Sequence, residues 1–513
     1  MKIYTKHNRT SNAIKNVMVG MGVQVLQVLT SLVCRVIFVR FLNETYLGIS
    51  GLFSNIISVL SLAELGIGSA IIYELYATLA NNDEKKTQSL MVYYKKAYML
   101  IGCIIGLIGL IIMPFVNKLV ILDDTVHESV YTLYILYLLN VVVSYFFSYR
   151  ENLIIASQNG YIVDIIRTVL TIVQNIVQCI ILIITRNFIL YLVIHIIITL
   201  LINIVIYYKS TKMYPFLKEK EVFPLDKETK NRMHSNVKAI FISTVSSKLI
   251  NSTDNILITA LGGIVQTGLN SNYVLISATL IAFTNKLCAG IRAGIGDAVV
   301  HKTDYEKIKL HDEIHFVFFW FFGFCSICYI FLSQDVVALF FGEKYVLDFA
   351  IPLITGLNMY IYHEYSYNDS FLQGMGLFKP IKYLNIVTGT LNIVLSIVLG
   401  KLYGTAGILA ATFISQLLTY RWYVPYVLYK FGFKSNVLHY FKRDLMYAAQ
   451  YASIIFLIYI ICKLVNFTGV LGLFVHMVIC VVIVNLVIVL FNFRKEEFRK
   501  FTQRMYSIVS KKK

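Results

Sequence analysis

Long apolar runs alternate with short polar segments from one end of the chain to the other. Most runs hold about 20 consecutive apolar residues or more, the length that a helix needs to cross the hydrocarbon core of a bilayer. A basic segment precedes the first run and no small-residue cleavage site follows it, so we expect a retained helix there, not a signal peptide. The pattern predicts an all-α, polytopic membrane protein of about fourteen spans, at residues 16–39, 46–77, 90–115, 129–151, 160–184, 188–208, 237–261, 270–293, 313–333, 348–372, 382–402, 404–429, 444–464 and 469–492.

Composition agrees with this fold class and explains the charge. Of the 513 residues, 58% are hydrophobic and only 14% are charged, which is far from the balance of a soluble domain. The net charge of +18 is high enough for a nucleic-acid-binding protein. However, Lys and Arg gather in alternate connecting segments, such as the one holding Lys442 and Arg443. That is the positive-inside pattern, so we expect membrane lipids as partners, no nucleic acid, and both termini in the cytoplasm.

The spans divide into two groups. A basic segment at 209–236 has six predicted spans before it and eight after it. We therefore expect an N-terminal lobe at 1–208, a C-terminal lobe at 237–430, two additional spans at 431–493 and a basic tail at 494–513. Gly66 to Ala70, at the end of the second span, is echoed by Gly294 to Ala298 at the end of the eighth. Two parallel six-helix repeats are typical of transporters whose binding site lies between the repeats.

Polar side chains follow one face of two predicted spans. On the first span, Gln24, Gln27, Ser31 and Arg35 recur at steps of three and four residues, which places them on one helical face. Lipid offers no hydrogen bonds, so such a face meets either neighbouring helices or a water-filled cavity. The cavity is favoured for the charged members, which are costly in hydrocarbon. The seventh span carries a comparable face, formed by Ser243, Ser247, Lys248, Asn251, Asp254 and Asn255.

Further charges lie in the second and eighth predicted spans. Glu64 is either a structural partner of Arg35 or a group that binds a coupling ion. Arg292 either lines the cavity or extends its side chain to the interface. The small residues Gly48 and Gly51 favour close packing of the second span against a neighbouring helix.

The tenth span is crowded with polar and aromatic groups between Tyr360 and Asp369. Glu364 and Asn368 are one helical turn apart. Aromatic faces beside carboxylates and amides suit sugar rings, and His363 or Glu364 could carry a coupling proton. A tyrosine-rich helix end at the membrane interface explains the same composition equally well.

Other chemistry-bearing residues lack companions in the sequence. His195 and His476 are single histidines on apolar runs and are expected in the core. Arg421 lies beside Trp422, and we expect it to pack on aromatic rings.

Motifs for catalysis and cofactor binding are likewise missing from the sequence. The Cys pair of the ninth span, in a Phe-rich run, has no second pair or histidine cluster nearby, so neither a zinc site nor a disulfide framework is predicted. No nucleotide-binding loop or catalytic triad stands out either. We therefore expect no cofactor, no metal and no enzymatic activity.

Three consecutive motifs resemble the amino-terminal signature of the Wzx-type polysaccharide flippases, part of the MATE-like exporter superfamily. They are R-x-I-F-x-R-x-L from Arg35, Y-L-G-I-x-G-L-F-x-N-I from Tyr46 and L-S-L-A-E-L-G-I-G-S-A-I from Leu60. The pattern N-S-x-D-N-I-L-I from Asn251 extends the resemblance to about residue 300. Beyond that point only the hydropathy agrees, and the last two spans exceed the twelve of other members.

The resemblance implies a bacterial cytoplasmic-membrane transporter that flips oligosaccharides linked to a polyprenyl pyrophosphate, of the kind used for O-antigen, capsule or exopolysaccharide. Arg35, Lys248 and Arg292 would then form a cationic cavity for the phosphates. Proton or sodium coupling would use Glu64, Asp254, His363 or Glu364. Other membrane proteins of polysaccharide assembly become possible partners.

Two other classes remain open. A small-molecule or multidrug exporter of the same superfamily would share the two lobes, but its cavity should be aromatic and acidic. A polysaccharide-processing membrane enzyme would need a large outer loop or a catalytic His, Asp and Arg set, and the predicted outer loops are short.

Overall fold

The structure is a computed structural model, and all regular secondary structure in its described part is helical. The chain forms two compact units, Met1–Gly268 and Leu269–Lys513. Apart from a few isolated positions, the described residues are 29–61, 67–119, 128–157, 159–218, 253–285, 302–377, 380–465 and 467–510.

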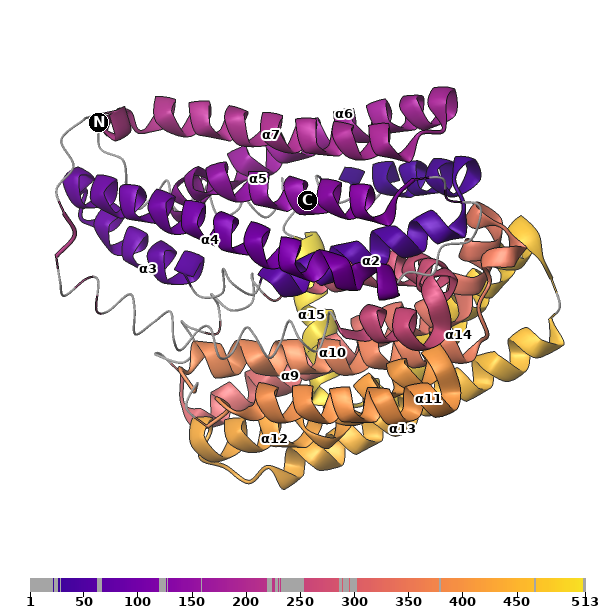
Figure 1. Ribbon diagram of the computed structural model, residues 1–513. Coiled ribbons are helices and arrows are strands. Elements are labelled where there is room, and N and C mark those ends of the chain that lie inside the picture. Colours follow the sequence, from indigo (N-terminus) through magenta and orange to yellow (C-terminus); the bar gives the residue numbers. More distant parts are fainter. Residues whose placement is uncertain are drawn as a thin grey trace. The chain divides into compact units, whose positions relative to one another are not determined.

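The first unit is a bundle of long helices, coloured indigo to magenta in Figure 1. Residues 29–41 are helical, and residues 253–268 begin a helix that continues to residue 285 in the second unit. Within the bundle, α5 packs against both α4 and α7, and α6 packs against α7. The elements between are α2 (Glu44–Leu60), α3 (Ile67–Ala80), α4 (Glu84–Leu119), α5 (Val130–Ala156), α6 (Gly160–Thr185), α7 (Phe188–Met213) and the 3-10 helix η2 (Pro215–Lys218).

Short polar residues start two of these helices. The side chain of Asn43 accepts a hydrogen bond from the backbone N–H of Tyr46 at 3.2 Å, so α2 begins directly after the preceding helix. Asn187 caps α7 in the same way, accepting from the N–H of Leu190 at 3.0 Å. These caps satisfy backbone donors that the apolar side chains around them cannot pair.

In the basic segment after α7, Asp226 contacts α4. Asp226 lies 3.4 Å from Lys86 and accepts a hydrogen bond from the backbone N–H of Thr229 at 2.8 Å. The hydrogen bonds from Thr229, followed by the charge of Lys86, lower the pKa of Asp226 to about 2. An acidic residue thus joins this basic segment to the first turn of α4.

Two glycines let α2 cross the helix at 253–285 at very short range. A Cβ atom at Gly48 would lie 2.1 Å from the carbonyl oxygen of Ile264, and one at Gly268 would lie 2.2 Å from that of Glu44. Gly48 therefore faces the backbone of Ile264, one turn before Gly268, and Gly268 faces the backbone of Glu44, one turn before Gly48. The predicted packing role of Gly48 agrees with this geometry.

The second unit, coloured orange to yellow in Figure 1, is built around α9 and α10, which pack along each other. A capping box starts α9, since Thr303 accepts from the N–H of Glu306 and the Glu306 side chain accepts from that of Thr303. The elements are α9 (Asp304–Phe341), η3 (Glu343–Tyr345), α10 (Ala350–Gly374), α11 (Leu384–Leu418), α12 (Tyr420–Val427), the π-helical turn η4 (Leu428–Gly432), α13 (Leu438–Leu464), α14 (Gly469–Asn492) and α15 (Glu496–Ser510).

The long element α11 is two helices joined at a kink. Gly404 has φ 59° and ψ −138°, a conformation that favours glycine and breaks the helix there. This break separates the eleventh and twelfth predicted spans at the expected place. A second break at Thr419 and the π-helical turn η4 divide the latter part further.

The two additional spans, α13 and α14, pack on the second unit. Their buried residues join those of α9 in one hydrophobic cluster that includes Phe319, Tyr447 and Val484. Trp320 of α9 donates to Asn485 of α14 at 2.9 Å and stacks on Phe498 of α15. The helix α15 thus continues from α14 and returns to α9.

The surfaces of these helices are apolar enough to face lipid. Seven described helices pass the length and hydropathy criteria for a membrane span, and a bent pair in α5 adds an eighth. Large apolar side chains are widely exposed on them, for example Ile184 of α6 and Leu464 of α13. The prediction of an all-α polytopic membrane protein is therefore confirmed. The first, second, seventh and eighth predicted spans each lie partly outside the described residues.

The glycine crossing generates a stability prediction. Gly48→Ala should destabilise the protein by about 1–3 kcal/mol, because the new methyl group meets backbone atoms that cannot rotate away. Gly51→Ala is the matched control, since its Cβ would lie 3.4 Å from a methyl group of Thr267. Thermal unfolding of the detergent-solubilised protein measures both, and equal melting temperatures would contradict the close crossing.

Candidate functional site

A polar pocket of about 480 Å³ opens within the helices of the first unit. Its lining comes from α4, α5, α6 and α7, which are otherwise rich in Ile, Leu and Val. Water-sized space between apolar membrane helices is unusual unless polar groups hold it open. The lining residues are Tyr98, Ser144, Tyr145, Ser148, Glu151, Asn152, Arg167, Thr171, Gln174, His195, Thr199, Ile202 and Asn203.

Three helices each bring a polar stripe to this pocket. On α6 the stripe is Arg167, Thr171 and Gln174, and on α7 it is His195, Thr199 and Asn203. Ser144, Ser148 and Asn152 form the third, on α5. Steps of three or four residues keep each set on one helical face. The opposite face of α6 exposes the apolar side chains of Val169, Val173, Ile176 and Ile180.

The pocket contains one ion pair and one unpaired amide group. Arg167 donates to Glu151 at 2.5 Å, which neutralises both charges. Asn203 is 6% exposed, and its Nδ2 has no hydrogen-bond partner among the described residues. A buried donor without a partner costs free energy unless something in the pocket accepts from it. The remaining hydroxyl and amide groups offer donors and acceptors without net charge.

Sequence analysis did not identify this pocket. The signal was present, because the stripes on the fourth, fifth and sixth spans have the same spacing as the one recognised on the first. These stripes carry few charges, so they stood out less from the apolar runs. The expectation for His195 was wrong: it lines the polar pocket together with hydroxyl and amide groups instead of being a core residue.

Arg35 lies in the first unit near aromatic hydroxyl groups. The phenols of Tyr137 of α5 and Tyr191 of α7 and the thiol of Cys34 lie close enough to interact with it electrostatically. Ser31, from the same predicted stripe, is half-buried on the same helical segment, and the isolated described residue Gln27 is half-buried as well. Asp254 and Asn255, at the start of helix 253–285, are half-buried as well. The remaining predicted site residues of these spans, namely Gln24, Glu64, Ser247, Lys248, Asn251 and Arg292, lie outside the described residues.

The second unit holds a buried network of charged residues from α9, α10, α12 and α13. Arg421 of α12 lies 2.8 Å from Oε2 of Glu364 and 2.9 Å from Oδ2 of Asp444. Arg443 of α13 forms an ion pair with Asp312 of α9. All five side chains are largely buried, so each ion pair also fixes the position of one helix against another.

Two sequence expectations are corrected by this network. Arg421 was expected to pack on aromatic rings; the Tyr360 ring does lie 5.9 Å away, but two carboxylates contact the guanidinium directly. Arg443 was counted among the basic residues of a connecting segment. It lies inside α13 and is 7% exposed. The sequence carried no signal that these residues meet, since they lie far apart along the chain.

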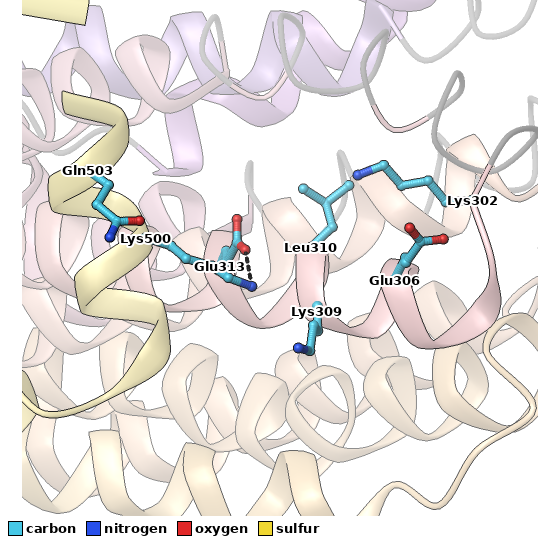
Figure 2. A pocket seen from close by; sticks show the side chains of 7 residues that line it. All are labelled: Lys302, Glu306, Lys309, Leu310, Glu313, Lys500 and Gln503. Atoms are coloured by element: carbon cyan, nitrogen blue, oxygen red, sulfur yellow. Dashed lines mark ion pairs between the residues drawn. The ribbon is translucent and has the colours of Figure 1, made fainter. Parts of the chain in front are cut away.

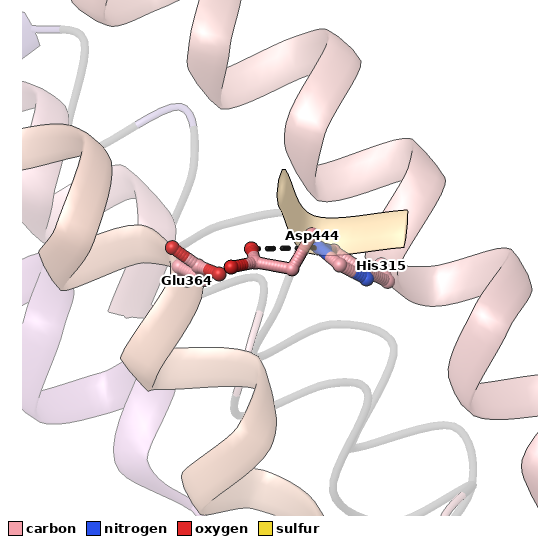
Figure 3. A group of neighbouring side chains, drawn as sticks. All are labelled: His315, Glu364 and Asp444. Atoms are coloured by element: carbon pink, nitrogen blue, oxygen red, sulfur yellow. Dashed lines mark ion pairs between the residues drawn. The ribbon is translucent and has the colours of Figure 1, made fainter. Parts of the chain in front are cut away.

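Histidines of α9 complete the network. His311 forms a hydrogen bond with Asn368 at 2.9 Å, and the ring of His315 lies between the rings of Tyr367 and Tyr440, stacked on both. Figure 3 shows His315, Glu364 and Asp444 converging, with ligand atoms within 4.8 Å of one another. Such a set could hold a metal ion, but Arg421 already occupies the space beside both carboxylates.

The two predicted ion-coupling candidates of α10 have different surroundings. Glu364 belongs to the charge network. His363 lies outside it and shares a hydrogen bond of 2.9 Å with Thr284, while its ring stacks on Phe322. Adjacent residues on a helix point about 100° apart, so the two do not form one site.

His476 is also not the isolated core residue that was expected. Its Nδ1 lies 2.6 Å from Oδ2 of Asp335 at the far end of α9. The sequence placed Asp335 in a connecting segment, but α9 extends through Phe341.

A groove of about 540 Å³ lies between α9 and α15. Figure 2 shows Lys500 of α15 reaching Glu313 of α9, at 3.1 Å. Hydrogen bonds from Lys500 and then Lys309 hold the pKa of Glu496 below its usual value. Since Lys309 and Lys500 are engaged by carboxylates, the groove is where α15 attaches to α9.

Comparison with known proteins now gives the family. Residues 13–285, more than half of the chain, match the family model described as "Polysaccharide biosynthesis protein". The chain belongs to this family. No curated protein matches the sequence significantly.

Solved structures show the same fold. The lipid II flippase MurJ in an inward closed conformation has a TM-score of 0.63 and 15% identity, covering 92% of this chain and 98% of its own. An inward-facing multidrug resistance MATE family transporter has a TM-score of 0.58 and 15% identity, covering 81% and 99%. An outward-facing one has 0.55 and 12%, covering 82% and 96%. The chain therefore shares the fold of these flippase and transporter structures.

The charge network generates the second prediction. Arg421→Met should destabilise the protein by about 3–5 kcal/mol, because it leaves two buried carboxylates without their cation. Lys430→Met is the control, since Lys430 is exposed in η4. Adding Glu364→Gln to Arg421→Met should recover part of the loss. Thermal unfolding in detergent is the measurement, and an Arg421→Met protein as stable as the control would contradict the assigned ion pairs.

Proposed function

We propose that the protein flips a polyprenyl-pyrophosphate-linked oligosaccharide across the bacterial cytoplasmic membrane. The observation that carries this proposal is the polar pocket of about 480 Å³ within an apolar helical bundle of a polysaccharide biosynthesis family member. An oligosaccharide is rich in hydroxyl groups and has to pass a layer that offers no hydrogen bonds. A pocket lined by hydroxyl, amide and phenol groups replaces the water that the sugar loses.

The pocket chemistry suits a sugar better than a cationic drug. Its ionised groups, Glu151 and Arg167, neutralise each other, and the other lining groups are mostly neutral. Tyr98 and Tyr145 supply ring faces of the kind on which the apolar faces of sugars pack. An exporter of cationic drugs would instead place uncompensated carboxylates in its pocket. The chemistry therefore favours the oligosaccharide over the multidrug alternative.

The phosphates of the carrier require cations. We assign this part of the proposal to Arg35, Lys248 and Arg292, because guanidinium and ammonium groups bind phosphate strongly where water is scarce. Arg35 is half-buried, and the phenols of Tyr137 and Tyr191 lie near it. The assignment of Lys248 and Arg292 rests on the sequence pattern alone.

In the proposed cycle, the predicted lobes 1–208 and 237–430 alternate in opening to the two sides of the membrane. Both termini would be cytoplasmic, with the basic segments at 209–236 and 494–513 on that side. The cycle would be driven by proton or sodium binding, for which Glu64, Asp254, His363 and Glu364 are the candidates. Contacts with other proteins of polysaccharide assembly would deliver or accept the substrate.

Flipping in reconstituted vesicles tests the proposal. The wild type should move a lipid-linked oligosaccharide from the inner to the outer leaflet, and Arg35→Ala and Lys248→Ala should slow this by about 10- to 100-fold through the loss of one charge-assisted contact each. Arg40→Ala is the control, because Arg40 is exposed on the same helix as Arg35. Export of a cationic dye without movement of the lipid-linked sugar would reject the proposal in favour of a drug exporter.

A second variant tests the pocket itself. Joint replacement Thr171→Val and Gln174→Leu removes two polar groups at nearly constant volume and should lower the flipping rate by about tenfold. The matched control is Thr185→Val, an exposed threonine at the end of the same helix. If both proteins flip at the wild-type rate, the pocket does not take part in sugar passage.

A further inference from the structure

The inner part of the charge network has more negative than positive groups. Arg443 is matched by Asp312, whereas Arg421 alone faces both Glu364 and Asp444. Among the described residues of this inner group, two carboxylates therefore share one guanidinium. A buried site with a net negative charge is costly unless a further cation or a proton balances it.

The two carboxyl groups also lie within hydrogen-bonding reach of each other. Glu364 and Asp444 come from α10 and α13, and Figure 3 shows their oxygen atoms side by side. Two ionised carboxylates so close together repel each other, and neither can donate a hydrogen bond. One proton removes the repulsion and supplies the donor, as in carboxyl pairs that hold a single proton between them.

The available space restricts the identity of the balancing ion. The cavity beside Glu364 and Arg421 has a volume of only about 10 Å³, close to the lower limit for a single water molecule. A metal ion with its ligands would also have to sit next to the guanidinium of Arg421, which lies 2.8 Å from Glu364. Both observations favour a proton over a metal ion.

His315 offers a route for that proton. It is 2% exposed, its Nε2 lies 3.9 Å from Oδ1 of Asp444, and its Nδ1 has no hydrogen-bond partner among the described residues. The ring stacks on Tyr367 and on Tyr440, whose electron-rich faces can attract a positive charge. An imidazole in this position can accept a proton and pass it on.

Other titratable groups around the pair are accounted for by their own contacts. His311 faces Asn368, and Tyr440 donates to Glu364 at 3.3 Å. Glu497 of α15 lies 3.5 Å from Arg443, at the edge of the network and near Lys495. The groups that face the pair or its neighbours from all packed elements are His311, Asp312, His315, Tyr360, Glu364, Tyr367, Arg421, Tyr429, His439, Tyr440, Arg443, Asp444, Tyr447 and Glu497.

We propose that Glu364 and Asp444 form a carboxyl pair that binds one exchangeable proton, and that His315 is the group that takes this proton from the pair and returns it. On release, the O–H bond of the pair breaks and an N–H bond forms at Nε2 of His315, so the pair gains a negative charge and the imidazole a positive one. Both carboxylates then compete for Arg421, which changes how α10, α12 and α13 are held together. The proposal identifies a proton as the coupling ion of the proposed transport cycle. The existence of the proton site is independent of the proposed function, and only its role in transport rests on that function.

Infrared difference spectroscopy of the full-length protein in detergent tests the proposal directly. At neutral pH the wild type should show a protonated-carboxyl C=O band that shifts in heavy water. Glu364→Gln and Asp444→Asn should each abolish this band. Asp369→Asn, a carboxylate on the same helix that accepts from Gln373 at 2.6 Å, should keep it. Persistence of the band in both pair variants, or its absence in the wild type, overturns the proposal.

Replacement of the histidine separates exchange from binding. His315→Gln should retain the band and slow its hydrogen–deuterium exchange by about tenfold or more. Exchange at the wild-type rate would overturn the role of His315. Calorimetric titration with Zn²⁺ or Ca²⁺ tests whether the site binds a metal ion instead. If the wild type lacks the band and binds the metal, and Glu364→Gln abolishes this binding, the site holds a metal ion and the proposal is overturned.

These measurements need no transport substrate. A band that behaves as expected, in a protein that flips no lipid-linked sugar, would leave the proton site in place and reject the transport proposal alone. Size-exclusion profiles and circular dichroism confirm that each variant is folded before its spectrum is compared.

Discussion

A charged side chain inside an apolar helical bundle has to be neutralised by another residue of the bundle, because neither lipid nor packed side chains can solvate it. The second unit follows this constraint closely. Arg421 and Arg443 each reach a carboxylate on another helix, so α13 is tied to α9, α10 and α12 by charge as well as by apolar packing. The two additional spans are for this reason an integral part of the unit.

The first unit uses different chemistry: its buried Arg150 lies over the rings of Tyr149 and Tyr207. Its buried polar groups are mostly hydroxyls and amides, whose hydrogen bonds tolerate a change of partner better than an ion pair does. They surround about 480 Å³, whereas the cavity within the charge network holds only about 10 Å³. The first unit can thus accommodate a sugar-sized group, and the network in the second can accommodate little more than a proton. Under the two proposals above, the first unit would bind the sugar and the second would bind the proton.

The family model covers residues 13–285, which include the helices that line the polar pocket. The solved flippase and exporter structures share the fold at 15% identity or less, so the chemistry of each pocket is left to the individual sequence. In this chain the pocket is nearly neutral and rich in hydrogen-bonding groups.

The sequence by itself determined the class of protein, because the length of an apolar run and the distribution of Lys and Arg are local properties of the chain. It also placed the boundary of two spans at residues 402–404, where the structure has the kink at Gly404, and it indicated close packing at Gly48. Tertiary structure alone decided which polar groups meet. His195 was expected in the core, but polar stripes on three helices form a pocket that it lines. Arg421 contacts carboxylates that lie 57 residues before it and 23 residues after it in the chain. Helical periodicity gives the face on which a side chain lies, but the neighbour of that face depends on how distant helices pack.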